Sequence, residues 1–378
     1  MPIVVEEEGA QVTHVAFVPD TLPTNLELSA RTWTNVVKAV EQLGRLDAVT
    51  SELGVDPVLL SRPTIRREAM STSALEGTFA PAAEVLTSEV DEDLPRSPAI
   101  VEILNFIKAT EHGVQRLAEL PIGTRLAKEL QDILIRGTLT DDWQRGEVRR
   151  TQVIIGPYKG CSVREATYVP PPPGPILEAG LDNWETWIHA ESDLHHVVRI
   201  AMAHYQFEAI HPFTDGNGRI GRLIAILQLI ETGILAQPLI NLSPFFEVRS
   251  DKYRYLLRQV SITGSWDDWI SFFCEALANQ AIEAAHRVRQ LLAWRDTTTN
   301  NLRSQRMRGV VMELAASLIE YPTVNVKQVA ERFNVTVTSA NTAVNKLVDE
   351  GVISEITGGN YNRVFQATDV IRIFFDAR

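Results

Sequence analysis

Apolar residues recur at the spacing of amphipathic helices along most of this chain. A helix that covers a core repeats apolar residues every third or fourth position, whereas a half-buried strand alternates every second position. The helical spacing starts near Leu26 and returns over residues 62–77, 97–137, 193–210 and 266–294. We therefore expect a mainly α-helical fold.

Two short β-type runs interrupt the helical pattern. Residues 151–156 and 165–169 flank the turn-rich segment 157–162, and this arrangement predicts a β-hairpin. Residues 170–175 hold five prolines and predict a stiff, extended connector that ends the hairpin. A spacer is the favoured role of this proline run, and a ligand for a proline-binding partner domain is the alternative.

The last part of the chain has its own pattern and predicts a separate unit over residues 305–378. A stretch rich in Thr, Asn and Arg, residues 296–304, precedes it as the expected linker. Helical spacing followed by two alternating runs around a glycine-rich turn is typical of a winged helix-turn-helix. The expected helices are 306–320, 326–333 and 337–348, and the expected strands are 352–356 and 363–367.

Composition and charge narrow the class of protein. The chain has 378 residues and a formal net charge of −12, which argues against a protein that mainly coats nucleic acid. Charges within 305–378 cancel, so DNA contact, protein docking and a structural role all stay open for that unit. The two cysteines, Cys161 and Cys274, form no Cys-x-x-Cys motif, which fits a reducing compartment.

The N-terminus and the hydropathy indicate the location. Residues 1–25 are polar with scattered prolines, predict an extended arm, and lack the basic and apolar regions of a signal peptide. No run approaches eighteen apolar residues, so we expect a cytoplasmic protein without a membrane span.

The most informative stretch is residues 211–222, which lead into the apolar run 223–230. A loop that enters a helix presents free N–H groups and the positive end of the helix dipole, which together bind anions. The stretch combines a base, an oxygen ligand, a glycine-rich turn and two guanidinium groups, supplied by His211, Asp215, Gly216, Asn217, Gly218, Arg219 and Arg222.

Each residue type in this stretch suits one part of a phosphate-handling site. Glycines let backbone N–H groups approach phosphate oxygens, and Asn217 tolerates a left-handed turn. The two arginines, three positions apart, are expected to reach one polyphosphate. Asp215 suits Mg²⁺, and His211 can take a proton from a hydroxyl near neutral pH.

The stretch resembles the Fic-family motif His-x-Phe-x-Asp/Glu-Gly-Asn-Gly-Arg-x-x-Arg. The match includes every specified position: His211, Phe213, Asp215, Gly216, Asn217, Gly218, Arg219 and Arg222. The resemblance implies transfer of AMP from ATP to a protein hydroxyl, with His211 as base and Asp215 on Mg²⁺. It also implies that ATP is contacted by Gly216, Asn217, Gly218, Arg219, Ile220, Gly221 and Arg222. A further residue of the ATP site, Glu76, is implied to inhibit the enzyme. A phosphorylating branch carries lysine where this chain has Gly218, so AMP transfer is favoured.

A second segment, residues 62–77, predicts a helix that begins at Pro63 and ends at Gly77. Thr72 and Glu76 lie four apart on one face of it. Thr72 to Gly77 resembles the Fic inhibitory motif Ser/Thr-x-x-x-Glu-Gly/Asn, which implies that Glu76 pairs with Arg222. The resemblance also implies that the hairpin is a flap that holds the target, and that Tyr253 is a wall of the nucleotide pocket.

Histidines cluster before the motif but do not predict a metal site. His204 and His211 are seven residues apart, which places them about 10 Å apart along a helix, too far for one small ion. We expect His204 to be packed or hydrogen-bonded instead.

Together these features predict a Fic-type helical core with a β-hairpin flap and a C-terminal winged helix-turn-helix. The expected division is an N-terminal helical region over 1–110, a catalytic core over 111–300 and the winged helix over 305–378. The expected function is a protein adenylyltransferase that uses Mg–ATP, modifies Ser, Thr or Tyr hydroxyls, itself included, and is restrained by Glu76. An AMP-removing hydrolase and a nucleotide-sensing transcription regulator remain as alternatives, and the oligomeric state, including a homodimer, stays open.

Overall fold

The computed structural model describes residues 1–7, 10–52, 57–91, 94–156, 158, 161–358 and 362–375. Within these residues the protein is mostly helical with small antiparallel sheets, as the apolar spacing predicts. No described helix is both long enough and apolar enough to cross a membrane.

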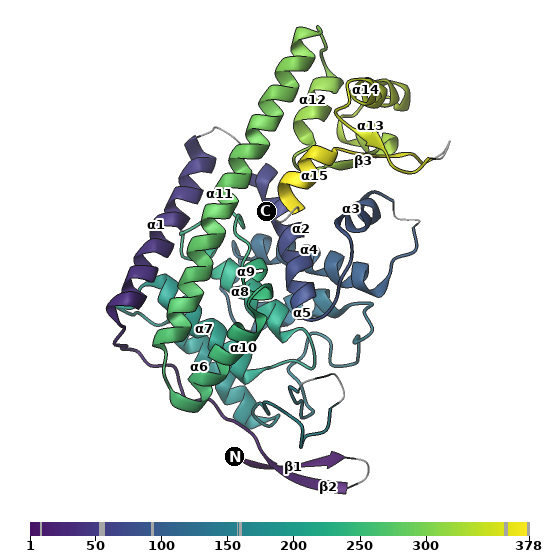
Figure 1. Cartoon of the computed structure of the whole chain (residues 1–378). Helices are drawn as coiled ribbons and strands as arrows, with labels where there is room; N and C mark the ends of the chain where they lie inside the picture. The colour runs from purple at the N-terminus through teal and green to yellow at the C-terminus, as the bar shows by residue number, and fades with distance from the viewer. Residues whose placement is uncertain are drawn as a thin grey trace.

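A long helix, α11 (Asp267–Ser304), runs through the height of the molecule, and α1 (Ala30–Glu52) lies along it (Figure 1). The start of α1 is fixed to the start of α11, because the Ser29 hydroxyl and backbone N–H both donate to the Asp267 carboxylate. The linker predicted over 296–304 is wrong, since α11 continues through it. Thr and Asn lower helix propensity only slightly, and the buried Leu302 gives this end of the helix a packing partner.

The middle of the chain forms a helical core around α7 (His196–Ile210) and α8 (Asn217–Glu231). Nearly every residue of this pair is buried, and helices that are apolar on all sides belong inside a protein. The surrounding helices are α2 (Pro57–Leu75), α3 (Ala82–Val90), α4 (Pro98–Arg116), α5 (Thr124–Ile135), α6 (Pro175–His189), α9 (Ser243–Glu247) and α10 (Ser250–Thr263).

The region predicted as a β-hairpin flap is more irregular than expected. Among its described residues, strand pairing consists of a bridge between Ile155 and Tyr168, while residues 157, 159 and 160 lie outside the described part. A hairpin appears instead at the N-terminus, where β1 (Pro2–Glu7) pairs antiparallel with β2 (Ala10–Val15). The expected extended arm is therefore wrong for this stretch.

The N-terminal hairpin packs against the flap. The buried side chains of Ile3, Ala16, Val163 and Val169 form a small apolar cluster between them. The Phe17 N–H also donates to the Val169 carbonyl at 2.8 Å. The flap therefore gains its support from the N-terminal residues rather than from its own strand pairing.

The C-terminal part contains the expected helices and two elements that the sequence pattern missed, β3 and α15. Its three strands pair antiparallel in the order β3-β5-β4. Its buried apolar side chains continue the cluster around α11, and α15 also contacts α2. The winged-helix interpretation and the division at residue 305 stay predictions. The elements are α12 (Val310–Ser317), β3 (Thr323–Asn325), α13 (Val326–Arg332), α14 (Val337–Asp349), β4 (Ser354–Glu355), β5 (Val364–Gln366) and α15 (Thr368–Phe375).

Candidate active site

The turn between α7 and α8 is shaped by two left-handed residues. His211 ends α7 with φ 51°, and Gly216 precedes α8 with φ 85°. Asn217 braces the turn from inside, because its side-chain oxygen accepts from the Phe213 N–H at 2.8 Å and its amide donates to the Phe213 carbonyl at 2.9 Å. The left-handed role predicted for Asn217 is therefore wrong: Gly216 takes it, and Asn217 is the first residue of α8.

The turn holds the His211 imidazole as a neutral base. Its Nδ1 lies 3.3 Å from the Glu208 carbonyl oxygen, which can only accept, so Nδ1 carries the proton. The other ring nitrogen, Nε2, then keeps its lone pair. Burial, together with the nearby positive charge of Arg149, lowers the pKa of His211 to about 4. A neutral imidazole with one free lone pair is the form that a general base requires.

A buried arginine that sequence reasoning missed, Arg149, joins this base to the flap. Its Nε donates to the His211 carbonyl at 2.8 Å, and its two terminal nitrogens donate to the carbonyls of Thr151 and Pro171. Burial lowers the pKa of Arg149 to about 10, so the side chain still carries its charge at neutral pH. No local motif marks this residue, because its partners lie 2, 22 and 62 positions away.

The segments predicted to meet, around Thr72 and Arg222, do meet. The Arg222 side chain is 1% exposed, and its Nε donates to the Thr72 hydroxyl at 2.8 Å. Its Nη2 donates to the Glu76 carboxylate at 2.7 Å. Gly77, with φ 88°, lies just past the end of α2 and turns the chain after Glu76. Pro63 lies inside α2 rather than in its first turn, because the helix begins at Pro57.

This contact is an ion pair rather than a neutral hydrogen bond. Burial opposes ionisation of Glu76, yet the charge of Arg222 and its hydrogen bond bring the pKa of the carboxyl below the ordinary value. Burial likewise opposes the charge on Arg222, but the neighbouring carboxylates raise the pKa of the guanidinium. Both groups are therefore charged at neutral pH.

The ion pair lies in a cavity of about 830 Å³ that also contains the base. Glu76, His211, Gly218, Arg222 and Tyr253 are among its lining residues, which agrees with the wall position expected for Tyr253. A Cβ atom added at Gly218 would lie 2.4 Å from Glu76 Oε1 and 3.0 Å from Arg222 Nη1. The carboxylate therefore sits directly against the glycine at the start of α8.

The remaining motif residues are not among the described residues that line this cavity. Arg219 is 3% exposed, and its Nη1 donates to the Glu102 carboxylate on α4 at 2.8 Å. Asp215 accepts from Arg219 at 3.3 Å and from the Gly216 N–H at 2.6 Å. Arg219 is paired with Glu102 here, and its charge also acts on Glu76. That Arg219 and Arg222 reach one polyphosphate stays a prediction.

Two further positions, Ile220 and Gly221, pack into the protein. Ile220 is fully buried in the apolar core, and a Cβ atom at Gly221 would lie 2.8 Å from Glu208 Oε1 on α7. Both residues therefore set the spacing between α7 and α8 and do not line the cavity.

A buried polar network lies behind the cavity. His204 Nε2 is 2.8 Å from the Tyr253 hydroxyl, which confirms that His204 is a hydrogen-bonded histidine, and burial lowers its pKa to about 3. Glu208 lines the cavity, and burial raises its pKa to about 7 although Arg222 opposes the shift. The only signal for Glu208 in the sequence is its spacing, three residues before His211, which sequence reasoning did not use.

Comparison with known proteins assigns the family. Residues 121–229 match the Fic/DOC family, and residues 33–115 match the Fic/DOC family N-terminal region; together these segments make up just over half of the chain. The chain belongs to the Fic/DOC family. The match over 121–229 contains the α7–α8 turn, and the match over 33–115 contains Thr72 and Glu76. The family match therefore includes both sides of the ion pair.

Relatives of this Fic/DOC chain share part of its sequence. Over 95 residues it is 43% identical to the protein adenylyltransferase Fic of Culex quinquefasciatus and 40% identical to that of Drosophila grimshawi. These matches cover 25% of this chain and 17% of each relative. A crystal structure of a Fic family protein from Desulfovibrio desulfuricans G20 has a similar fold, with a TM-score of 0.59 over 92% of this chain and 98% of that one. Its 19% sequence identity supports the shared fold alone.

Proposed function

We propose that this protein transfers AMP from ATP to a hydroxyl group of a protein side chain, its own included. The observation that carries the proposal is one cavity that joins a neutral His211, the glycine at the start of α8 and the buried cation Arg222. The names of the relatives, protein adenylyltransferase, support the same chemistry. The target is expected to be a Ser, Thr or Tyr residue.

In this mechanism the base acts through its free nitrogen. His211 Nε2 takes the proton of the target hydroxyl, and the oxygen attacks the α-phosphorus of ATP. The bond from the α-phosphorus to the bridging oxygen breaks, and pyrophosphate leaves. Arg149 holds the carbonyl of the same histidine, so the imidazole stays in one position during the proton transfer.

The phosphates need donors, and the start of α8 supplies them. Backbone N–H groups at Gly218 and its neighbours point out of the helix N-terminus, where the helix dipole favours negative charge. Arg222 is the charged partner for the terminal phosphate of ATP. Because these groups are fixed before ATP arrives, they stabilise the charge that builds up on the phosphate oxygens.

The residues present fit a Mg²⁺ ion that arrives with ATP. The Asp215 side chain is 36% exposed at the turn before α8, and Mg²⁺ is commonly held by one carboxylate plus phosphate oxygens. No group of three or more His, Cys, Asp or Glu side chains among the described residues could hold a metal alone. When bound, the ion would neutralise phosphate charge, and Asp215 is the residue that would hold it.

We also propose that Glu76 restrains the enzyme. Its carboxylate takes the Arg222 donor that the terminal phosphate needs and lies against Gly218. ATP can still enter in part, but its triphosphate is then held with the α-phosphorus out of line with the target oxygen.

Labelled ATP tests the proposal. The protein is incubated with Mg²⁺ and ATP that is labelled at the α-phosphate, and a parallel sample carries label at the γ-phosphate. Label from the α-position on protein, with the mass of AMP by mass spectrometry, supports the proposal. Label from the γ-position alone would mean a kinase, and removal of AMP from a modified protein without transfer would mean a hydrolase. Either result would overturn it.

A further inference from the structure

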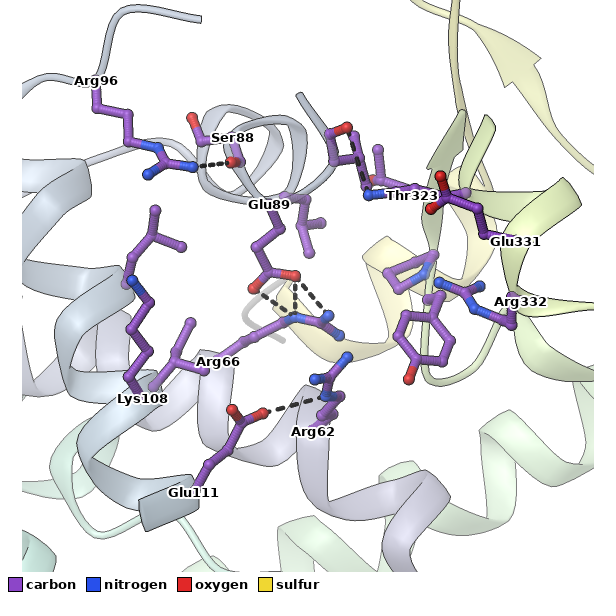
Figure 2. Close-up of a pocket in the computed structure, with 17 residues that line it drawn as sticks. Arg62, Arg66, Ser88, Glu89, Arg96, Lys108, Glu111, Thr323, Glu331 and Arg332 are labelled. Carbon is purple, nitrogen blue, oxygen red and sulfur yellow. Dashed lines mark hydrogen bonds and ion pairs between the residues drawn. The ribbon is translucent and has the colours of Figure 1, made fainter. Parts of the chain in front are cut away.

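A second cavity, of about 570 Å³, separates the helices of the N-terminal region from the C-terminal unit (Figure 2). Its walls come from α2, α3 and α4 on one side and from β3 and α13 on the other. No described residue lines both this cavity and the one that contains His211. It is therefore a distinct site within the described part of the chain.

The walls of this cavity are rich in cations although the protein as a whole is acidic. Its carboxylates are Glu89, Glu111 and Glu331. Its cations outnumber them and are Arg62, Arg66, Arg96, Lys108 and Arg332. A positive cavity on a chain with a formal net charge of −12 attracts anions locally while the rest of the surface repels them.

The two arginines from α2 are held with their guanidinium groups directed into the cavity, as Figure 2 shows. Arg66 donates to the Glu89 carboxylate at 2.5 Å and to the Glu320 carbonyl at 2.6 Å. Arg62 donates to Glu111 at 3.2 Å. These contacts fix the positions of the donors before any ligand binds, which lowers the entropy lost on binding.

The wall from the C-terminal unit has buried polar atoms without partners. Among the described residues, Nη1 of Arg332, Oγ1 of Thr323 and Oε1 of Gln328 are buried and have no hydrogen-bond partner. Thr323 is 3% exposed. Buried polar groups are normally satisfied, so three in one cavity wall indicate a missing partner. Two of the three are donors, and an anion accepts from both.

Arg332, on the wall from the C-terminal unit, lies near two other guanidinium groups and near the Glu320 carboxylate. Arg332 lies over the Tyr321 ring at 3.4 Å from its centroid, and Arg62 lies at 5.0 Å from the same centroid. Burial is the main cause that lowers the pKa of Arg332; Tyr321 and Glu320 oppose this shift, and the charges of Arg62 and Arg66 add to it. An anion seated among these guanidinium groups would offset both the burial and the repulsion.

We propose that this cavity binds a small anion that carries a phosphate group, with Arg332 and the arginines of α2 as its cationic partners. Guanidinium groups match the oxygens of phosphate, and Thr323 supplies a neutral donor beside them. The volume exceeds that of a single phosphate, so both free phosphate and the phosphate of a small metabolite fit.

Binding at this site would reach the inhibitory contact through α2. Arg66 and Glu76 are ten residues apart, about 15 Å along a helix axis. An anion held between α2 and the C-terminal unit stabilises α2 in the position where Glu76 contacts Arg222, and it therefore slows transfer. This consequence rests on the proposed function, whereas binding itself does not.

Titration calorimetry on the full chain at low ionic strength tests binding, with inorganic phosphate and AMP as separate probes. Arg332→Gln should weaken phosphate binding roughly ten-fold, the value of one charge-assisted contact. Lys108→Gln, at the exposed rim, should weaken it roughly three-fold. Arg308→Gln removes the same charge from an exposed position outside the cavity and should change nothing. Circular dichroism shows that each variant is folded.

The results distinguish free phosphate from a phosphorylated metabolite, and they test the binding site separately from its effect on transfer. If AMP binds more tightly than phosphate, and Arg332→Gln weakens AMP binding roughly ten-fold as well, the ligand is assigned as a phosphorylated metabolite. Equal binding of AMP and phosphate assigns free phosphate. No binding to the wild type, or equal loss in Arg308→Gln, overturns the site. If anion binding stabilises the contact between Glu76 and Arg222, phosphate should lower the residual self-labelling of the wild type. It should leave the self-labelling of Glu76→Gly unchanged. An equal decrease in both would mean competition at the active site, and it would leave the calorimetric assignment intact while refuting the coupling.

Discussion

Replacing Glu76 by glycine should remove the inhibition of AMP transfer, and the structure indicates that this change leaves the rest of the site in place. The Glu76 side chain reaches Arg222 from beyond the last residue of α2, so its loss removes no helix interior contact. Arg222 keeps its hydrogen bonds to the Thr72 hydroxyl and carbonyl, at 2.8 and 3.3 Å. The guanidinium therefore stays in position while its Nη2 becomes available to a phosphate.

The magnitude follows from what the carboxylate occupies. Its Oε1 lies 2.4 Å from where a Cβ atom at Gly218 would be, so a phosphate at the start of α8 and this carboxylate cannot share the space. When the α-phosphate is displaced by roughly 1 Å from the in-line position, the rate of transfer falls by about 10²-fold. Self-labelling of Glu76→Gly should therefore exceed that of the wild type by about 10²-fold.

The assay needs a small set of variants and ATP with a label at the α-phosphate. Glu76→Gln keeps the size and removes the charge, so it should label at an intermediate rate. Glu76→Gly combined with Arg222→Ala should not regain activity, because the phosphate partner is absent. Equal labelling of the wild type and Glu76→Gly would refute the inhibitory role, and strong labelling of the double variant would refute the role of Arg222.

Three further changes test the remaining parts of the site. His211→Ala should lower transfer by ~10²–10⁴-fold, the typical contribution of a general base, while calorimetry still detects ATP binding; full activity would exclude His211 as the base. Asp215→Asn should raise the Mg²⁺ concentration needed for half-maximal transfer, and wild-type transfer that persists in EDTA would exclude the ion. Arg149→Gln should lower kcat roughly ten-fold with little change in KM for ATP, since Arg149 positions the base and faces no phosphate; a change confined to KM would contradict this.

The sequence predicted most of the local geometry of the turn before α8, because the residues that form the turn lie in one short segment. The turn, its glycines and the helix that follows are adjacent along the chain, so their geometry follows from residue types and spacing. The contact between Glu76 and Arg222 was also predicted, but from a family resemblance rather than from spacing. Two residues 146 positions apart carry no periodic signal that would pair them.

The features that the sequence did not predict share a physical cause: their conformation depends on partners that are distant along the chain. Arg219 has the same residue type and helix turn as Arg222, yet its partner is Glu102 on α4, 117 positions away, and residue spacing did not predict that contact. Residues 296–304 have the composition of a linker, but the buried Leu302 extends the helix through them. Arg149 and Glu208 act through burial and through backbone carbonyls, neither of which leaves a motif in the sequence.

Glu208 offers a test of these buried charges that does not depend on activity. Its pKa is raised from an ordinary value of 4.5 to about 7, so the folded protein binds more protons than the unfolded chain between these pH values. Stability contributed by this group therefore falls as pH rises through that window. His211, with its lowered pKa, acts in the opposite direction, but it is present in wild type and variant alike and cancels from their difference. Glu208→Gln should thus gain roughly 2 kcal/mol of unfolding free energy relative to the wild type between pH 5 and pH 8. Urea unfolding at both pH values measures this difference, with the exposed change Glu313→Gln as the matched control. A difference that stays constant with pH would mean that Glu208 is solvated and ionised like an ordinary surface carboxylate.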